Sequence, residues 1–369
     1  MKKAILITLI IHIVSIGYSQ SSEKKPSYVQ LEYLYGNIIA HSPDSNAFLE
    51  GHPEGFIISW NQKNYGGEHW ESRYNYPDFG ISLSYQDYKS QVLGDLYALY
   101  GHYNFYLLNR KKVNKLILRT GFGISYNTNP YDKEHNNKNI AFGSAIGSST
   151  YFKLYYQREN ILNRLGLNAG LTFIHASNAN VKSPNNGVNS WAVTLGVNYQ
   201  LDENPTPFDL IPSEDPLKYR EPIKLNIALR GGVNEAEYIG SGMKGFGVLS
   251  VYADKRLSKN SAIQIGSDLY YSPFLEEYYN IANVKNPDKL TSFTNIRIGG
   301  FIGYEQFVNK FSVVGQIGYY LVSDFDYQTK VYEALTLKRY LNKKWFVAIR
   351  LKVHGADAET VEFGGGIRF

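Results

Sequence analysis

Cysteine is absent from the chain, and its absence excludes several kinds of chemistry at once. Without cysteine there is no disulfide bond, no thiolate nucleophile and no lipid anchor attached through a cysteine. Excess charge of one sign is also lacking. The formal net charge is +5, and removal of Lys2 and Lys3 with a leader segment lowers it to +3. So small a bias does not favour nucleic acid as a partner.

Long hydrophobic runs are missing beyond the first residues. The apolar run from Ala4 to Ile16 follows two lysines and is shorter than the roughly 20 apolar residues that a membrane-spanning helix needs. Gly17 and Ser19 are small residues at the −3 and −1 positions of a cleavage site. We therefore expect residues 1–19 to be a signal peptide. No later segment approaches this length without a charge, so no membrane helix is expected after it.

Tyrosine and glycine, in contrast, are abundant. They occur 32 and 33 times, and aromatic residues make up 15% of the chain. The mean hydropathy is nevertheless only −0.32. This combination is typical of a transmembrane β-barrel, because one face of each strand is apolar, the other is polar or small, and aromatic residues gather at the membrane interfaces. Secreted β-sandwiches are the alternative, but they rarely need so many alternating segments in one chain.

Sixteen segments alternate between apolar and polar or small residues, and each is bounded by turn residues. In one of them Phe79, Ile81 and Leu83 interleave with glycine and serine. Lysine and arginine within the segments fall on the polar parity, which suits a wet interior and not a dry core. The predicted fold class is therefore all-β, a transmembrane antiparallel β-barrel of about 16 strands, with 12 to 16 compatible with the pattern. A single barrel is expected to occupy residues 20–369.

The last alternating segment runs from Val361 to Phe369 and finishes on an aromatic residue. Together with a signal peptide, this arrangement resembles the C-terminal signature of bacterial outer-membrane proteins, so the bacterial outer membrane is the expected location. Short basic turns alternate with longer polar loops, as expected for periplasmic turns and external loops. The segments Tyr65–Pro77 and Asp202–Glu221 break this alternation, because they are long but fall on the periplasmic side. The second contains four prolines and is a candidate connection between two halves of the barrel.

One strand carries a base and a hydroxyl nucleophile on its apolar face. In the segment Leu165–Ile174 the odd-numbered positions are apolar, and the same parity continues to His175 and Ser177. In a barrel the apolar face meets lipid, so this pair is expected at the external end of the lipid-facing stripe, facing the outer leaflet. Asn189 shares the parity of Trp191 on the next strand and should therefore face lipid beside the pair.

These side chains have the chemistry of a hydrolytic site. Ser177 needs a base to become nucleophilic, His175 is within reach as that base, and the base needs a third group to hold its tautomer. The side-chain carbonyl of Asn189 can accept a hydrogen bond from the imidazole, although it cannot stabilise the imidazolium by charge. Asn178 is placed to donate to a developing oxyanion. We therefore expect an enzyme that cuts lipid without a cofactor.

The segment His175–Gly187 resembles the active-site segment of the outer-membrane lipid A deacylases, whose Bacteroidetes relatives are often labelled acyloxyacyl hydrolases. The resemblance covers about residues 25–202 and leaves residues 203–369 as additional strands. It implies a carboxylic ester hydrolase in which His175 is the general base, Ser177 the nucleophile and Asn178 an oxyanion-hole contributor. The implied substrate is lipid A, or lipopolysaccharide, of the outer leaflet, which would lose an ester-linked acyl chain through an acyl-Ser177 intermediate. Four upstream stretches are similar to the same relatives: Gly51–Gly55, Tyr74–Gly80, Gly101–Phe105 and Tyr126–Asp132.

One departure from the deacylase pattern leaves a second activity open. The deacylases place a glutamate twelve residues after the serine, where this chain has Asn189. Outer-membrane phospholipase A has His-x-Ser-Asn with an asparagine at that distance, and it depends on calcium. Calcium-dependent phospholipid hydrolysis is therefore the alternative activity, while the Pro184-Asn185-x-Gly187 context favours deacylation.

A non-enzymatic porin or solute channel is the third alternative. Sixteen strands in one barrel would leave an aqueous lumen. Cations within the strands would then tune the pore, and the candidates are Arg119, Arg230, Arg297, Arg350 and Lys352. A porin, however, needs no base and nucleophile on its outer surface.

Several loop residues carry weaker signals. Lys133, Lys138 and Lys182, on loops expected outside the membrane, are candidate point charges for lipid A phosphates. Asp132 and Glu134 are alternative sources of a carboxylate for the base, if their loop folds over the rim. Calcium ligation is the other alternative for these acidic residues.

Two histidines outside the catalytic strand are expected to be structural. His52 lies with Glu54 in a turn entering a strand, where a metal-binding role is the alternative. His102 shares the parity of Asn104 and is expected to line the lumen. There is no P-loop, dinucleotide fingerprint or zinc spacing, and no metal site is predicted.

Overall fold

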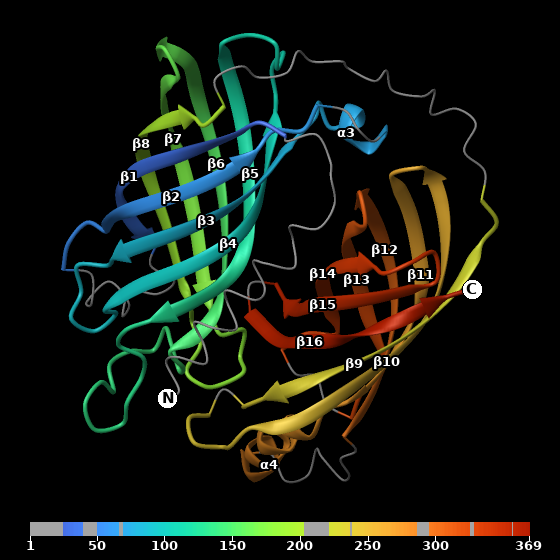
Figure 1. Ribbon diagram of the computed structural model, residues 1–369. Coiled ribbons are helices and arrows are strands. Elements are labelled where there is room, and N and C mark those ends of the chain that lie inside the picture. The colour runs from blue at the N-terminus through green and yellow to red at the C-terminus, as the bar shows by residue number, and fades with distance from the viewer. Residues whose placement is uncertain are drawn as a thin grey trace, which may run out of the picture.

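The computed structural model describes residues 25–39, 50–65, 69–202, 221–236, 238–285, 295–324, 328–355 and 357–369. The expected signal peptide, residues 1–19, lies outside these ranges. Within them the chain forms sixteen β-strands arranged as two closed antiparallel barrels, with few helical residues (Figure 1). No helix in the described ranges has the length and apolar character needed to cross a membrane.

The first barrel contains the strands that carry the catalytic candidates. A short helix, α3 (His69–Arg73), lies in the connection between its second and third strands. The barrel closes because β8 pairs with β1, with Leu31 opposite Val197 in the register. Its strands are β1 (Ser27–Ile39), β2 (Glu54–Gln62), β3 (Asp78–Asp87), β4 (Asp95–Tyr106), β5 (Asn114–Asn127), β6 (Ile146–Leu162), β7 (Leu165–Ser177) and β8 (Val188–Gln200).

The second barrel repeats this plan with the next eight strands. It closes because β16 pairs with β9, with Ile367 opposite Ile227. A 3₁₀ turn, η3 (Pro273–Leu275), and a helix, α4 (Glu276–Lys285), follow its third strand. Its strands are β9 (Lys224–Asn234), β10 (Lys244–Ser258), β11 (Ser261–Tyr271), β12 (Ile296–Val308), β13 (Phe311–Val322), β14 (Val331–Tyr340), β15 (Trp345–His354) and β16 (Asp357–Arg368).

The all-β prediction and the count of sixteen strands are confirmed, but the sheet closes twice and not once. The single barrel expected over residues 20–369 is therefore replaced by two units of eight strands. The physical reason is that period-two alternation is a property of each strand, whereas closure depends on which strand edges meet through backbone hydrogen bonds. The proline-containing segment Asp202–Glu221, most of which lies outside the described residues, connects two barrels and not two halves of one.

The outer faces of both barrels are apolar, as the alternation predicts. On β7, for example, Leu167 and Leu171 are 51% and 59% exposed, whereas the residues that follow each of them, Asn168 and Thr172, are buried. Exposed aliphatic side chains in such numbers suit a hydrocarbon surrounding. His102 is buried inside the first barrel, as expected, where its ring is hydrogen-bonded to Ser82 and to Asn61.

The barrel interiors are filled by paired charges. In the first barrel the buried carboxylate of Glu32 contacts both Lys153 and Arg119. An eight-stranded barrel is only wide enough for side chains to fill it. In the second barrel the in-strand cations likewise meet carboxylates, and the pairs are Arg230–Glu362, Arg297–Glu359, Arg350–Asp268 and Lys352–Glu359. The five cations considered as pore-lining groups are thus all engaged in buried ion pairs, which opposes the porin alternative.

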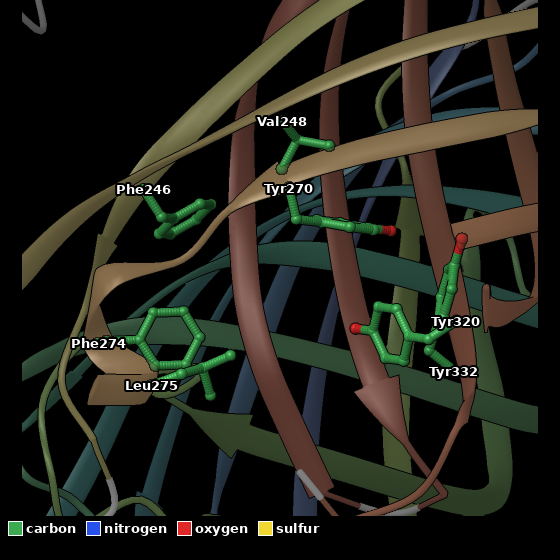
Figure 2. Close-up of a cluster of buried hydrophobic side chains, with 7 residues drawn as sticks. All are labelled: Phe246, Val248, Tyr270, Phe274, Leu275, Tyr320 and Tyr332. Carbon is green, nitrogen blue, oxygen red and sulfur yellow. The ribbon is translucent and has the colours of Figure 1, made fainter. Parts of the chain in front are cut away.

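Apolar side chains cover one end of each interior. In the second barrel, η3 brings Phe274 and Leu275 against side chains from β10, β11, β13 and β14 (Figure 2). The remaining members of this cluster are Phe246, Val248, Tyr270, Tyr320 and Tyr332. In the first barrel a comparable cluster joins the β3–β4 and β5–β6 loops to the ends of β7 and β8, and it contains Tyr88, Leu93, Leu96, Ala141, Phe142, Ala176 and Val188. The catalytic candidates therefore lie beside a packed barrel end.

Candidate functional site

The proposed base and its orienting residue are directly opposite each other on neighbouring strands. The register of β7 with β8 pairs His175 with Asn189, and two residues further along it pairs Phe173 with Trp191. Residues opposite each other in an antiparallel pair have side chains on the same face, about 5 Å apart at Cβ. Because Trp191 is exposed on the outer surface, His175 and Asn189 share that outward face.

A chain of hydrogen bonds joins the three predicted side chains. Nδ1 of His175 lies 2.6 Å from Oδ1 of Asn189, and Nε2 of His175 lies 3.1 Å from Oγ of Ser177. With an amide oxygen facing it, Nδ1 carries the proton and donates, so Nε2 is the acceptor for the Ser177 hydroxyl. This is the tautomer in which an imidazole can remove a proton from serine.

The site lies where the apolar belt of the barrel ends. Ser177 is 7% exposed, and His175 and Asn189 are half-buried. Further along the same outward face, Leu171 and Trp191 are exposed. An ester at the boundary between acyl chains and headgroups would therefore reach the hydroxyl without leaving the membrane interface.

Asn178 is adjacent to Ser177, but the loop uses much of its hydrogen-bonding capacity. Its side-chain amide donates to the carbonyl of Lys182 at 2.7 Å, and its backbone N–H donates to Oδ1 of Asn185 at 2.8 Å. The side-chain amide has two N–H groups, and the Lys182 carbonyl accepts from one of them. Asn185 is a residue whose role sequence reasoning missed, since only its place in the Pro184-Asn185-x-Gly187 pattern was noted.

The β7–β8 loop is fixed against its neighbour. The backbone N–H groups of Asn186 and Gly187 donate to the carbonyls of Ile140 and Ala141 in the β5–β6 loop. Gly187 has φ +66°, and a Cβ atom there would lie 3.1 Å from Cβ of Ser177. Glycine is therefore required at this position by both the backbone conformation and the proximity of the serine.

The three candidate phosphate-binding lysines, Lys133, Lys138 and Lys182, are exposed on the β5–β6 and β7–β8 loops. None of them forms an ion pair with another residue of the described ranges. They are thus placed on the two loops that meet beside Ser177, with their charges available to an anionic headgroup.

The acidic candidates of the β5–β6 loop are occupied within that loop. Oδ1 of Asp132 accepts hydrogen bonds from the backbone N–H groups of Glu134 and His135, and it contacts the His135 ring at 3.0 Å. The hydrogen bonds from the His135 and Glu134 backbone lower the pKa of Asp132 below its ordinary value of 3.8. Asp132 therefore stabilises its own turn, and the group found at Nδ1 of His175 is the Asn189 amide.

A metal site is not assembled from the other candidates. Nδ1 of His52 contacts the side chain of Asn37, whereas Glu54 accepts hydrogen bonds from Tyr33 and pairs with Lys89. Among the described residues no group of three or more histidine, aspartate and glutamate side chains is arranged to hold a metal ion.

A contact from the second barrel also reaches the site loop, and sequence reasoning missed it. The backbone N–H of Ser183 donates to Oε2 of Glu235, and the Ser183 hydroxyl donates to the carbonyl of Ala236. No local sequence signal could have found this pairing, because 52 residues separate Ser183 from Glu235.

Two family models match the chain, one on each barrel. Residues 54–198 match the model described as Lipid A 3-O-deacylase (PagL), and residues 223–369 match the model described as Acyloxyacyl hydrolase, C-terminal domain. The first match contains the whole His175, Ser177 and Asn189 arrangement. Together the two matches cover most of the chain.

Solved structures of other outer-membrane proteins are similar to the chain only at low identity. A mutant of the Rhodopseudomonas blastica porin is 8% identical over 93% of this chain and 99% of that chain, with a TM-score of 0.17. The Acinetobacter baumannii outer membrane protein Omp33 is 8% identical over 94% of this chain and 100% of that chain, with a TM-score of 0.18. Among curated proteins none matches.

Proposed function

Since the chain belongs to the lipid A deacylase family of the bacterial outer membrane, we propose that it removes an ester-linked acyl chain from lipid A through an acyl-Ser177 intermediate. The observation that carries this proposal is the hydrogen-bonded chain from Ser177 through His175 to Asn189 on the outward face of the first barrel. A base, a hydroxyl and an orienting group in this order are the parts that ester hydrolysis by serine requires.

The first half of the reaction forms the acyl-enzyme. Nε2 of His175 takes the proton of the Ser177 hydroxyl while Oγ attacks the ester carbonyl carbon, and the carbonyl oxygen becomes an oxyanion. When the ester C–O bond breaks, the imidazolium gives that proton to the departing alkoxide oxygen of lipid A, which leaves as a hydroxyl. Asn189 keeps Nδ1 protonated and the ring oriented throughout, as a neutral partner of the imidazolium.

The second half releases the fatty acid. Water gives a proton to Nε2 of His175 and attacks the acyl carbonyl, and the bond to Oγ of Ser177 breaks with return of the proton to Oγ. An oxyanion forms in each half of the reaction. Its proposed side-chain donor is the amide of Asn178, the residue after Ser177, through the N–H that does not bond to Lys182.

The position of the site supports a substrate taken from the outer leaflet. Lipid A is anchored by its acyl chains, so its ester bonds lie between the apolar belt and the phosphorylated headgroup. The apolar face of β7 and β8 suits the acyl chains. Lys133, Lys138 and Lys182 suit the phosphates as exposed point charges. No cofactor has a part in this mechanism.

Phospholipid hydrolysis is the second candidate, and the amide at position 189 favours it. The arrangement of asparagine, histidine and serine is the one that the resemblance to outer-membrane phospholipase A implies. The two candidates are separated by incubating the purified protein with lipopolysaccharide and with phospholipid vesicles, each with calcium and with a chelator. Mass spectrometry should find lipid A that has lost one acyl chain, in equal amounts with and without the chelator. Fatty acid released only from phospholipid, and only with calcium, would reject lipid A deacylation.

A further inference from the structure

The β7–β8 loop, residues 178–187, is held from outside its own barrel. Ser183 and Asn180 of this loop are 2% and 3% exposed, and Glu235 and Ala236 of the second barrel are 4% and 1% exposed. Three hydrogen bonds cross between them. The N–H of Ser183 donates to Oε2 of Glu235 at 2.9 Å, the hydroxyl of Ser183 donates to the carbonyl of Ala236 at 2.7 Å, and the N–H of Glu235 donates to the carbonyl of Asn180 at 3.3 Å.

The Glu235 carboxylate is held by backbone groups on both sides. While Oε2 faces Ser183, Oε1 accepts hydrogen bonds from the N–H groups of Gly240 and Gly242 at 3.1 and 3.2 Å. Within the described ranges it forms no ion pair with lysine or arginine. A buried carboxylate whose partners are backbone N–H groups on two loops joins those loops by charge-assisted hydrogen bonds, which are stronger than neutral ones. The β9–β10 loop is thereby fixed to the β7–β8 loop.

Ser183, which is bonded to Glu235, lies in the sequence between the two residues that hold Asn178. The carbonyl of Lys182 accepts from the Asn178 side chain, and Oδ1 of Asn185 accepts from the Asn178 backbone N–H. Positions 182 and 185 flank Ser183, so the bond to Glu235 constrains both acceptors. Through them it constrains the peptide that follows Ser177. A displacement of about 1 Å at a reacting group can reduce a rate roughly 100-fold.

We propose that the second barrel acts as a positioning domain for the site, and that Glu235 is its positioning residue. Glu235 touches neither substrate nor reacting atoms. It holds the β7–β8 loop so that Ser177 faces His175 and Asn178 faces the oxyanion. This inference rests on the proposed function for its catalytic consequence, but the docking of the loop can be measured without any activity.

The kinetic test compares Glu235→Gln with wild type in the full-length protein on lipopolysaccharide. Glutamine offers one acceptor oxygen where two are needed, so the bonds to Ser183 or those to the glycines are lost. We expect kcat to fall about tenfold or more, with KM within about twofold, because the loop orders the reacting groups and does not hold the substrate. Glu276→Gln is the matched control, since Glu276 is exposed on the same barrel and pairs only with Lys244 in the described ranges. It should keep both constants.

The structural test measures the docking itself. Because the chain has no cysteine, spin labels can be placed at Asn186→Cys and Ile239→Cys, both exposed positions on the two loops. The distance between the labels should have one narrow distribution in the wild-type background and a broad one with Glu235→Gln. An unchanged kcat, a rise in KM alone, or a lower kcat with a distribution that stays narrow would each overturn the proposal.

A fluorophosphonate probe separates this inference from the identity of the substrate. The probe reacts with an activated serine whether or not lipid A is cleaved. Slower labelling of Ser177 in Glu235→Gln than in wild type supports positioning, even if wild type leaves lipopolysaccharide intact and the proposed substrate is rejected. Equal labelling rates in the two proteins would overturn positioning while leaving the deacylase function standing.

Discussion

Nδ1 of His175 lies 2.6 Å from Oδ1 of Asn189, so the imidazole that faces Ser177 is oriented by a neutral amide on the neighbouring strand. An amide fixes the tautomer and the ring plane as a carboxylate does, but it adds no opposite charge when the imidazolium forms. The site is therefore built to orient the imidazole, and a carboxylate at position 189 would add the missing charge.

Asn189→Ala should lower kcat about tenfold to 100-fold, because it removes one hydrogen bond to a group that becomes charged, about 1.5–3 kcal/mol. Asn189→Asp is nearly isosteric and should retain or raise kcat by restoring a negative charge beside the imidazolium. Initial rates of fatty-acid release measure both. Asn186→Ala, an exposed position of the adjoining loop, is the control. Equal rates for Asn189→Ala and wild type would show that Asn189 does not orient the base.

The loop lysines are predicted to act on binding and not on chemistry. Lys182→Gln should raise KM for lipid A that carries its phosphates about twofold to fivefold, as expected for a screened, exposed charge, and leave kcat unchanged. Dephosphorylated lipid A should show no such rise. Lys310→Gln, exposed on the β12–β13 turn, serves as the control. A rise in KM that is equal for both substrates would mean that Lys182 does not meet a phosphate.

The interior ion pairs of the first barrel predict a large stability effect. Glu32→Ala leaves Lys153 and Arg119 buried without their shared carboxylate, and should lower the free energy of unfolding by about 3–5 kcal/mol. Glu54→Ala, which breaks the half-exposed pair with Lys89, should cost less than about 1 kcal/mol. Urea unfolding in vesicles, followed by intrinsic fluorescence, compares the two. Similar losses would contradict a dry, filled interior.

The β5–β6 loop has a predicted pH dependence. The pKa of Asp132 is lowered in the folded loop by hydrogen bonds from the backbone of His135 and Glu134. Its stabilising effect is therefore complete above the ordinary value of 3.8 and is lost as the pH falls through the lower folded pKa. The side-chain carboxyl carbon resonance of Asp132 in micelles should therefore titrate with a midpoint below pH 3.8. A midpoint at or above 3.8 would contradict the hydrogen bonds.

The sequence predicts that the candidate catalytic side chains lie together, because their arrangement is local. Strand parity places His175, Ser177 and Asn189 on one outward face, and the length of the hairpin brings β7 and β8 into register. Closure of the barrel is not local. Every strand presents backbone hydrogen-bonding groups along its edge, so the alternation of side chains does not say whether β8 pairs with β1 or with β9. The alternation therefore predicts sixteen strands but not two barrels.

The anchoring of the site loop shows the same limit. Asn178 is found from its place beside Ser177, but its acceptors, the Lys182 carbonyl and Asn185, depend on the path of the loop. The bond from Ser183 to Glu235 depends on how the two barrels meet, which no periodicity encodes. Buried polar contacts between distant segments are therefore the part of the site that the sequence does not predict.

The central claim is that Ser177 is the nucleophile and His175 its base in lipid A deacylation. The most direct test is the mass spectrum of lipid A after incubation with wild type, Ser177→Ala, His175→Ala and the double variant, with correct folding checked by heat-modifiable electrophoretic mobility. We predict that wild type removes one acyl chain. Each single variant should lose several orders of magnitude in rate, and the double variant should lose no more than either, because the two side chains act as a unit. Deacylation by folded Ser177→Ala at the wild-type rate would contradict the account.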